Sequence, residues 1–144
     1  MRVLRTIATM ASALLLLSLF ATGAGAAGGR PFSTALVGAN EVPLTGAPDA
    51  SGTASLWINP GLGTVCWSIS VSNVDPIGAA HIHLAPAGSP GAVVVPLNPY
   101  TGGCAIVSRE LALAIVTNPS AYYVNVHNGA YPGGAARGQL SRTP

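Results

Sequence analysis

Residues 63–72 read GTVCWSISVS, and this stretch decides the fold class of the chain. Apolar and polar side chains alternate along it, so every second residue lies on the same face of an extended strand. One face is apolar and consists of Val65, Trp67, Ile69 and Val71. The other face carries the hydroxyl groups of threonine and serine and the thiol of Cys66. A strand with one buried and one hydrated face is typical of an antiparallel sheet.

The rest of the chain repeats this pattern on both sides of that strand. The Pro-Gly pair at residues 60–61 is a turn signal that predicts a hairpin from a strand at 51–59 into the strand at 63–72. Glycine and proline separate further short strands, which we expect at residues 32–37, 79–84, 93–95, 104–107, 121–127 and 135–140. These strands predict an antiparallel β-sandwich or barrel.

One helix interrupts the strands, at residues 108–117. Ser108 is expected to cap it, and Leu111 and Ile115 are expected to point toward the core, with Leu113 as a further candidate for that face. About eight strands, one short helix and no linker predict a single all-β domain.

Residues 1–26 have the layout of a secretory signal peptide. Arg2 and Arg5 precede an apolar segment at residues 7–20, and the Ala-Gly-Ala at residues 24–26 offers a cleavage site. A membrane anchor is the alternative, although the apolar run is shorter than the roughly 20 residues that span a bilayer. We expect a domain at residues 27–144 that is secreted to the extracellular space or the cell envelope, with no membrane span after cleavage.

The predicted mature domain has few charges, and they balance. Charged residues make up 7% of the 144-residue chain, against about 25% in an ordinary globular domain. Arg2 and Arg5 leave with the leader, so four of the six basic residues remain to balance the four acidic ones. Because no basic patch is left, we expect neither nucleic acid nor an anionic membrane as a partner.

The chain has two cysteines, Cys66 and Cys104. An even number of cysteines in an exported domain predicts a disulfide bond between them. Two free buried thiols are the alternative. A metal site made of cysteine is the weakest option, since neither cysteine has a partner at CxxC spacing.

The three histidines of the chain are His81, His83 and His127. His81 and His83 share one face of a predicted strand, and the alternate residues up to Leu84 are expected to face the core. His127 ends another strand, whose Val124 and Val126 point inward. The three imidazoles converge if these strands are neighbours, and imidazole suits copper, zinc and nickel. The alternative is that they are hydrogen-bonding residues that pack beside Tyr122, Tyr123 and Asn125.

Other chemistry has little support in the sequence. The acidic residues are scattered, Ser89 lacks the G-x-S-x-G context of a nucleophile, and the chain has no lysine for a phosphate-binding loop. Glu41 and Asp75 are interpreted as turn or cap residues. Arg137 is interpreted as a structural residue that pairs with Glu41 or with backbone carbonyls, and an anion-attracting role beside a metal is the alternative.

Five stretches of the chain resemble, in the same order, the motifs of the chordin-type (CHRD) domain family. They are FSTALVGANEVP at residues 32–43, AAHIH at 79–83, GAVVVPL at 91–97, YYVNVH at 122–127 and YPGGAARGQL at 131–140. The chain departs from the family at Leu44, where a second proline is frequent, and this affects a loop. The resemblance implies an extracellular fold of immunoglobulin-like type, similar in architecture to copper/zinc superoxide dismutase.

That similarity also bears on the histidines. His81 and His83 resemble the H-x-H copper-ligand strand of those enzymes, His127 stands in for a later ligand, and Arg137 stands in for an arginine in a late glycine-rich segment. A copper–zinc pair needs more histidines than the three of this chain. The resemblance therefore leaves room for one copper or zinc ion and does not predict dismutase activity.

Taken together, these observations predict a secreted CHRD-type module that acts in extracellular binding or as a structural part, and not as an enzyme. Its partner is an extracellular protein or surface ligand that the sequence does not identify. The alternative is a protein that binds one copper or zinc ion through His81, His83 and His127. Convergence of the three imidazole nitrogens distinguishes the two.

Overall fold

A computed structural model describes residues 28–143 of the chain, so the predicted signal peptide at residues 1–26 lies outside the described part. The described part is an all-β domain with one α-helix, as the sequence predicts. Its strands are β1 (Arg30–Val37), β2 (Ser51–Asn59), β3 (Thr64–Ser72), β4 (Ala79–Leu84), β5 (Ala92–Pro96), β6 (Gly102–Ile106), β7 (Tyr122–His127), β8 (Ala136–Gln139) and β9 (Ser141–Arg142). Its helices are α1 (Arg109–Thr117) and the 3₁₀ turns at Gly38–Asn40 and Pro119–Ala121.

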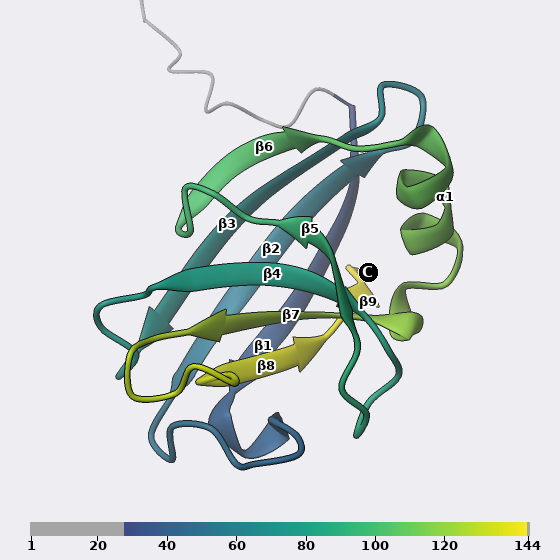
Figure 1. Cartoon of the computed structure of the whole chain (residues 1–144). Helices are drawn as coiled ribbons and strands as arrows, with labels where there is room; N and C mark the ends of the chain where they lie inside the picture. The colour runs from purple at the N-terminus through teal and green to yellow at the C-terminus, as the bar shows by residue number, and fades with distance from the viewer. Residues whose placement is uncertain (1–27, 144) are drawn as a thin grey trace, which may run out of the picture.

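All strands belong to one antiparallel sheet in the order β5-β4-β7-β8-β1-β2-β3-β6, and the short strand β9 also pairs with β1. In Figure 1, β1, β2 and β3 run diagonally behind β4, β7 and β8. The chain segment between β5 and β6 joins the two edges of the sheet. Leu97 N–H donates to Ala80 O on one side (2.9 Å), and Ile69 N–H donates to Thr101 O on the other (2.8 Å). The sheet therefore forms a nearly closed barrel.

The hairpin of β2 and β3 confirms the alternation that decides the fold. The side chains of Val65, Trp67 and Ile69 are buried in the core, whereas the serines on the opposite face are exposed. On that outer face Cys66 lies directly across from Cys104 of β6, and the two form a disulfide bond with an S–S distance of 2.07 Å. The predicted disulfide is confirmed.

Helix α1 lies at one end of the barrel (Figure 1). It begins after Ser108, whose Oγ accepts a hydrogen bond from Leu111 N–H at 3.1 Å, as the predicted cap requires. Ile115 is fully buried, but Leu113 is 56% exposed, so its predicted place on the core face is wrong. Two residues correspond to about 200° of helix rotation, which puts Leu113 opposite Ile115. None of the helices in residues 28–143 is both long and apolar enough to span a membrane.

The outer face of β4, β7 and β8 is covered by loops. Residues 41–50 and 128–135 meet there, since Ala47 N–H donates to Ala135 O at 2.8 Å. Residues 85–91 approach from the other side and are held by β8. The expectation that Leu84 faces the core is wrong, since it is 48% exposed, whereas His83 lies on the outer face as expected but is buried there. The difference arises because β4 ends at Leu84 while the loops cover His83.

Candidate metal centre

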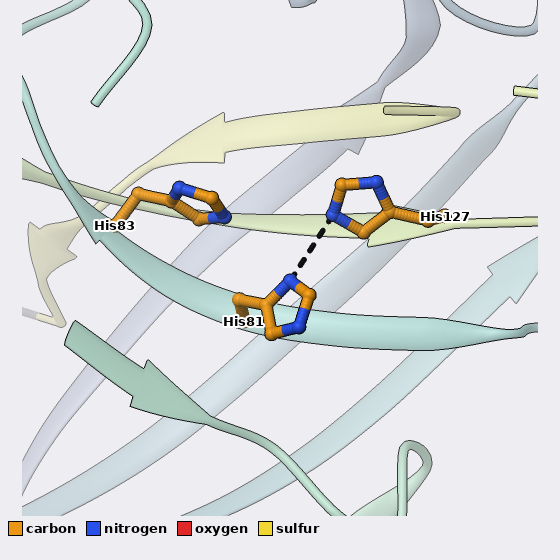
Figure 2. Close-up of side chains that lie close together, drawn as sticks. All are labelled: His81, His83 and His127. Atoms are coloured by element: carbon orange, nitrogen blue, oxygen red, sulfur yellow. Dashed lines mark hydrogen bonds between the residues drawn. The ribbon is translucent and has the colours of Figure 1, made fainter. Parts of the chain in front are cut away.

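The pairing of β4 with β7 brings the three histidines together, as Figure 2 shows. His81 lies opposite Asn125 and His83 lies opposite Tyr123, so their side chains share the outer face of the barrel with His127. Ring centroids are 5.0 Å apart for His81 and His127, 5.5 Å for His81 and His83, and 6.4 Å for His83 and His127. One nitrogen of each ring lies within 4.8 Å of those of the other two.

This spacing is close to that of ligands on a common ion. In a tetrahedral site with metal–nitrogen bonds of about 2.05 Å, neighbouring ligand atoms are about 3.3 Å apart. His81 Nδ1 and His127 Nε2, at 3.2 Å, already have this separation, whereas the nitrogens of all three rings lie within 4.8 Å of one another, so at least one ring must move inward to share the ion. The sequence predicted convergence only on the condition that the two strands are neighbours, and that condition is met.

His83 is held in one orientation by two contacts. Its Nδ1 lies 2.9 Å from the carbonyl oxygen of Gly91, so Nδ1 carries a proton and donates it. Its ring stacks on Tyr123 with centroids 4.7 Å apart and planes 10° apart, and the Tyr123 hydroxyl accepts a hydrogen bond from Gly91 N–H. In the neutral ring Nε2 then has a free lone pair. This nitrogen is buried and has no hydrogen-bond partner within residues 28–143.

His127 is oriented in the same way by a different loop. Its Nδ1 lies 3.0 Å from the carbonyl oxygen of Pro132 and donates to it. Its Nε2 therefore faces the centre of the cluster, 3.2 Å from His81 Nδ1 (the dashed line in Figure 2) and 3.0 Å from Asn125 Oδ1. A backbone carbonyl that fixes the tautomer of a histidine is the usual outer partner of a metal ligand.

The surroundings of His81 and His127 favour the neutral form of their imidazoles. Burial lowers the pKa of His81, and the neighbouring His127 and His83 lower it further. Burial also lowers the pKa of His127, the hydrogen bond to Pro132 opposes the shift, and His83 adds to it. Because a metal binds the deprotonated imidazole nitrogen, groups that stay neutral compete less with the ion.

A second buried polar group, Glu41, lies near Asn125 of β7 and Arg137 of β8. It follows the 3₁₀ turn at Gly38–Asn40, and its backbone N–H donates to Gly38 O, so it caps a turn as predicted from the sequence. Its side chain is only 6% exposed. Burial raises the pKa of Glu41 to about 7, against the opposing effects of Arg137 and a hydrogen bond from Asn125.

Arg137 links this group to the loops. It is 2% exposed, and its Nη2 donates to the carbonyl oxygens of Pro86 (3.2 Å) and Ser89 (2.7 Å). Its guanidinium carbon lies 3.4 Å from the centre of the Tyr123 ring, a cation–π contact. Since β7 lies between β4 and β8, the Tyr123 ring separates Arg137 from His83. Arg137 thus contacts Tyr123, on which the His83 ring stacks, and is not itself part of the imidazole cluster.

Sequence reasoning missed the backbone groups that orient the imidazoles. Gly91 and Pro132 supply them from loops, and no residue pattern marks a carbonyl oxygen. The close fit around Gly91 is a partial signal, because a Cβ at this position overlaps the carbonyl oxygen of Leu84. A glycine is therefore required where the loop passes β4.

A comparison with models of known protein families assigns the chain to a family. The model of the CHRD domain matches residues 32–140, which include both cysteines and all three histidines. No curated protein and no solved structure matches the chain. Since the matched segment covers most of the sequence, the chain belongs to the CHRD domain family.

Proposed function

We propose that this chain is an exported CHRD module that binds one transition-metal ion, copper or zinc, through His81, His83 and His127. The observation that carries the proposal is the convergence of three imidazole nitrogens on the outer face of β4 and β7. Two of the rings donate Nδ1–H to backbone carbonyls, which leaves their Nε2 lone pairs free for the ion. Three protein nitrogens with a further position are a common arrangement around zinc.

The competing interpretation, a purely hydrogen-bonded histidine cluster, explains only part of the arrangement. It accounts for the contact between His81 and His127. It leaves Nε2 of His83 buried without a partner among the described residues. An unsatisfied buried polar atom costs about 1–3 kcal/mol. An ion at the centre of the cluster removes this cost.

Export and the absence of enzymatic activity are parts of the same proposal. The disulfide between Cys66 and Cys104 and membership of the CHRD family are compatible with an extracellular protein. The sequence offers neither a paired nucleophile and base nor a pair of carboxylates. We therefore assign the module a binding role, with an extracellular protein or surface ligand as its partner beside the ion.

Calorimetric titration of the exported, disulfide-bonded chain with Zn(II) and Cu(II) tests the proposal. We expect one ion per chain. His83→Ala should weaken binding by more than the about 10- to 100-fold that loss of an outer partner costs. Ser70→Ala, on the exposed face of β3, is the control and should bind like the wild type. Absence of stoichiometric binding, or equal affinity in His83→Ala, contradicts the proposal.

A further inference from the structure

The contacts of His127 contain an electrostatic conflict. Nδ1 of His127 donates its proton to Pro132 O, so Nε2 of the neutral ring carries a lone pair. An amide oxygen, Asn125 Oδ1, lies 3.0 Å from this nitrogen and also carries only lone pairs on that side. Two acceptors at this distance repel each other unless a positive charge lies between or beside them.

The orientation of Asn125 is fixed from its other end. Asn125 lies on the outer face of β7 and is 2% exposed. Its side chain forms a hydrogen bond with the carboxyl group of Glu41, and since an amide nitrogen donates to a carboxylate, Nδ2 faces Glu41. The oxygen of the same amide is thereby directed toward His127. Burial raises the pKa of Glu41 to about 7 while Arg137 favours its ionised form, so the bond from the amide to the carboxylate is complete above that pH.

The distances around Nε2 of His127 agree with a shared ion. In a tetrahedral site with bonds of about 2.05 Å, neighbouring ligand atoms are about 3.3 Å apart. The distance from Nε2 to His81 Nδ1 is 3.2 Å, and the distance to Asn125 Oδ1 is 3.0 Å. One cation beside these three atoms accepts all their lone pairs, together with that of His83 Nε2.

We propose that Asn125 Oδ1 is a fourth protein donor to the metal ion, so that the site has three nitrogens and one oxygen. This inference rests on the proposed metal-binding function and adds a donor that is neither a histidine nor a charged residue. Glu41 acts as a positioning residue, because its carboxylate holds the amide in the orientation that presents the oxygen. A hydrogen-bonded carboxylate also increases the electron density on the amide oxygen, as it does for metal-bound histidine.

The donor set has a consequence for metal selectivity. An amide oxygen is a harder donor than imidazole and suits divalent ions better than Cu(I), which prefers soft ligands. Loss of Asn125 Oδ1 should therefore weaken Zn(II) binding more than Cu(I) binding. A residue that only stabilises the fold would lower both affinities by the same factor.

Titrations of Zn(II) and Cu(I) into the exported chain and its variants test the assignment. We expect Asn125→Ala to lower Zn(II) affinity by about 10- to 100-fold and Cu(I) affinity less. Asn125→Asp combined with Glu41→Gln keeps an oxygen at the site without placing two carboxylates side by side, and it should restore Zn(II) binding. Asn40→Ala removes a nearby amide that bonds to Arg137 O, and this control should leave both affinities unchanged.

Nuclear magnetic resonance of the wild type covers the case in which Asn125→Ala does not fold. Zn(II) should shift the side-chain amide signals of Asn125 and leave those of Asn40 in place. Wild-type Zn(II) affinity in a folded Asn125→Ala variant, an equal loss for both ions, or an unshifted Asn125 amide overturns the assignment. These outcomes differ from failure of the proposed function, in which the wild type itself binds no ion.

Discussion

The outer faces of β3 and β7 differ in what covers them. On β3 the outward Ser68 and Ser70 are exposed, and the strand alternates regularly between core and solvent. On β7 five consecutive residues, Tyr122 to Val126, are buried, since loops cover the outer face. Burial of charged groups such as Arg137 and Glu41 costs free energy unless they are paired. The β3 face is thus a solvent-facing surface, whereas the β7 face holds polar groups in fixed positions.

The largest effect that tests this difference is expected from Arg137→Met. The change removes the two charged hydrogen bonds to Pro86 O and Ser89 O, and it removes the positive charge that lowers the pKa of Glu41. A hydrogen bond from a charged donor contributes about 1.5–3 kcal/mol, so the loss of two costs on the order of 3–5 kcal/mol. Urea unfolding should show this loss. Arg30→Met, at an exposed position of β1, is the matched control, and an equal, small loss in both variants contradicts the described role of Arg137.

A smaller loss is expected on the other face from the double variant Cys66→Ala, Cys104→Ala. Removal of a disulfide typically lowers the free energy of unfolding by about 2–4 kcal/mol. The disulfide joins β3 to β6, whereas the imidazoles lie on β4 and β7, so Zn(II) affinity should stay at the wild-type value. Unfolding curves and zinc titrations of the folded variant measure both quantities. Loss of zinc binding with the fold intact would show that the two faces are coupled.

A third effect concerns the pH dependence of the metal-free chain. Because the pKa of Glu41 is raised from 4.5 to about 7, the folded chain binds this proton more tightly than the unfolded chain. The contribution of this proton to the free energy of unfolding is complete below about pH 4.5, and it is lost as the pH rises through 7. One pKa unit corresponds to about 1.4 kcal/mol, and since solvent screens part of the effect, we expect a change on the order of 2 kcal/mol.

The difference in unfolding free energy between wild type and Glu41→Gln isolates this contribution, because the histidines titrate in both proteins. From pH 4.5 to pH 8 the wild type should lose stability relative to Glu41→Gln. A constant difference would mean that Glu41 is ionised over the whole range. On the β3 face, Ser70→Ala should change stability by no more than about 0.5 kcal/mol at any pH.

The sequence predicts the fold well where one face of a strand meets water. Val65, Trp67 and Ile69 are buried as their alternation indicates, and the hairpin around residues 60–61 is present. The prediction of which side chains are buried fails at strand ends and on the helix, where the alternation of a strand does not apply. Leu84 ends its strand and is exposed, and Leu113 lies opposite the core face of α1. The strand β9 is too short to produce a periodic pattern.

The candidate site is predictable to a similar extent. The H-x-H spacing places His81 and His83 on one face, and the strand that ends at His127 supplies the third ring. The groups that orient these rings are carbonyls of Gly91 and Pro132, whose positions depend on how loops cross the barrel. The nearly continuous apolar run around Asn125 could have indicated a strand buried on both faces.

The pairing of β4 with β7 also concerns how the protein folds. His81 and His127 are 46 positions apart in sequence, so the cluster exists only after a long loop has closed and distant strands have paired. In an unfolded chain only His81 and His83 are close enough together to bind one metal ion. Binding energy from the complete cluster therefore adds to the native state alone, by mass action. An ion held by all three rings would report that the pairing of β4 with β7 has formed.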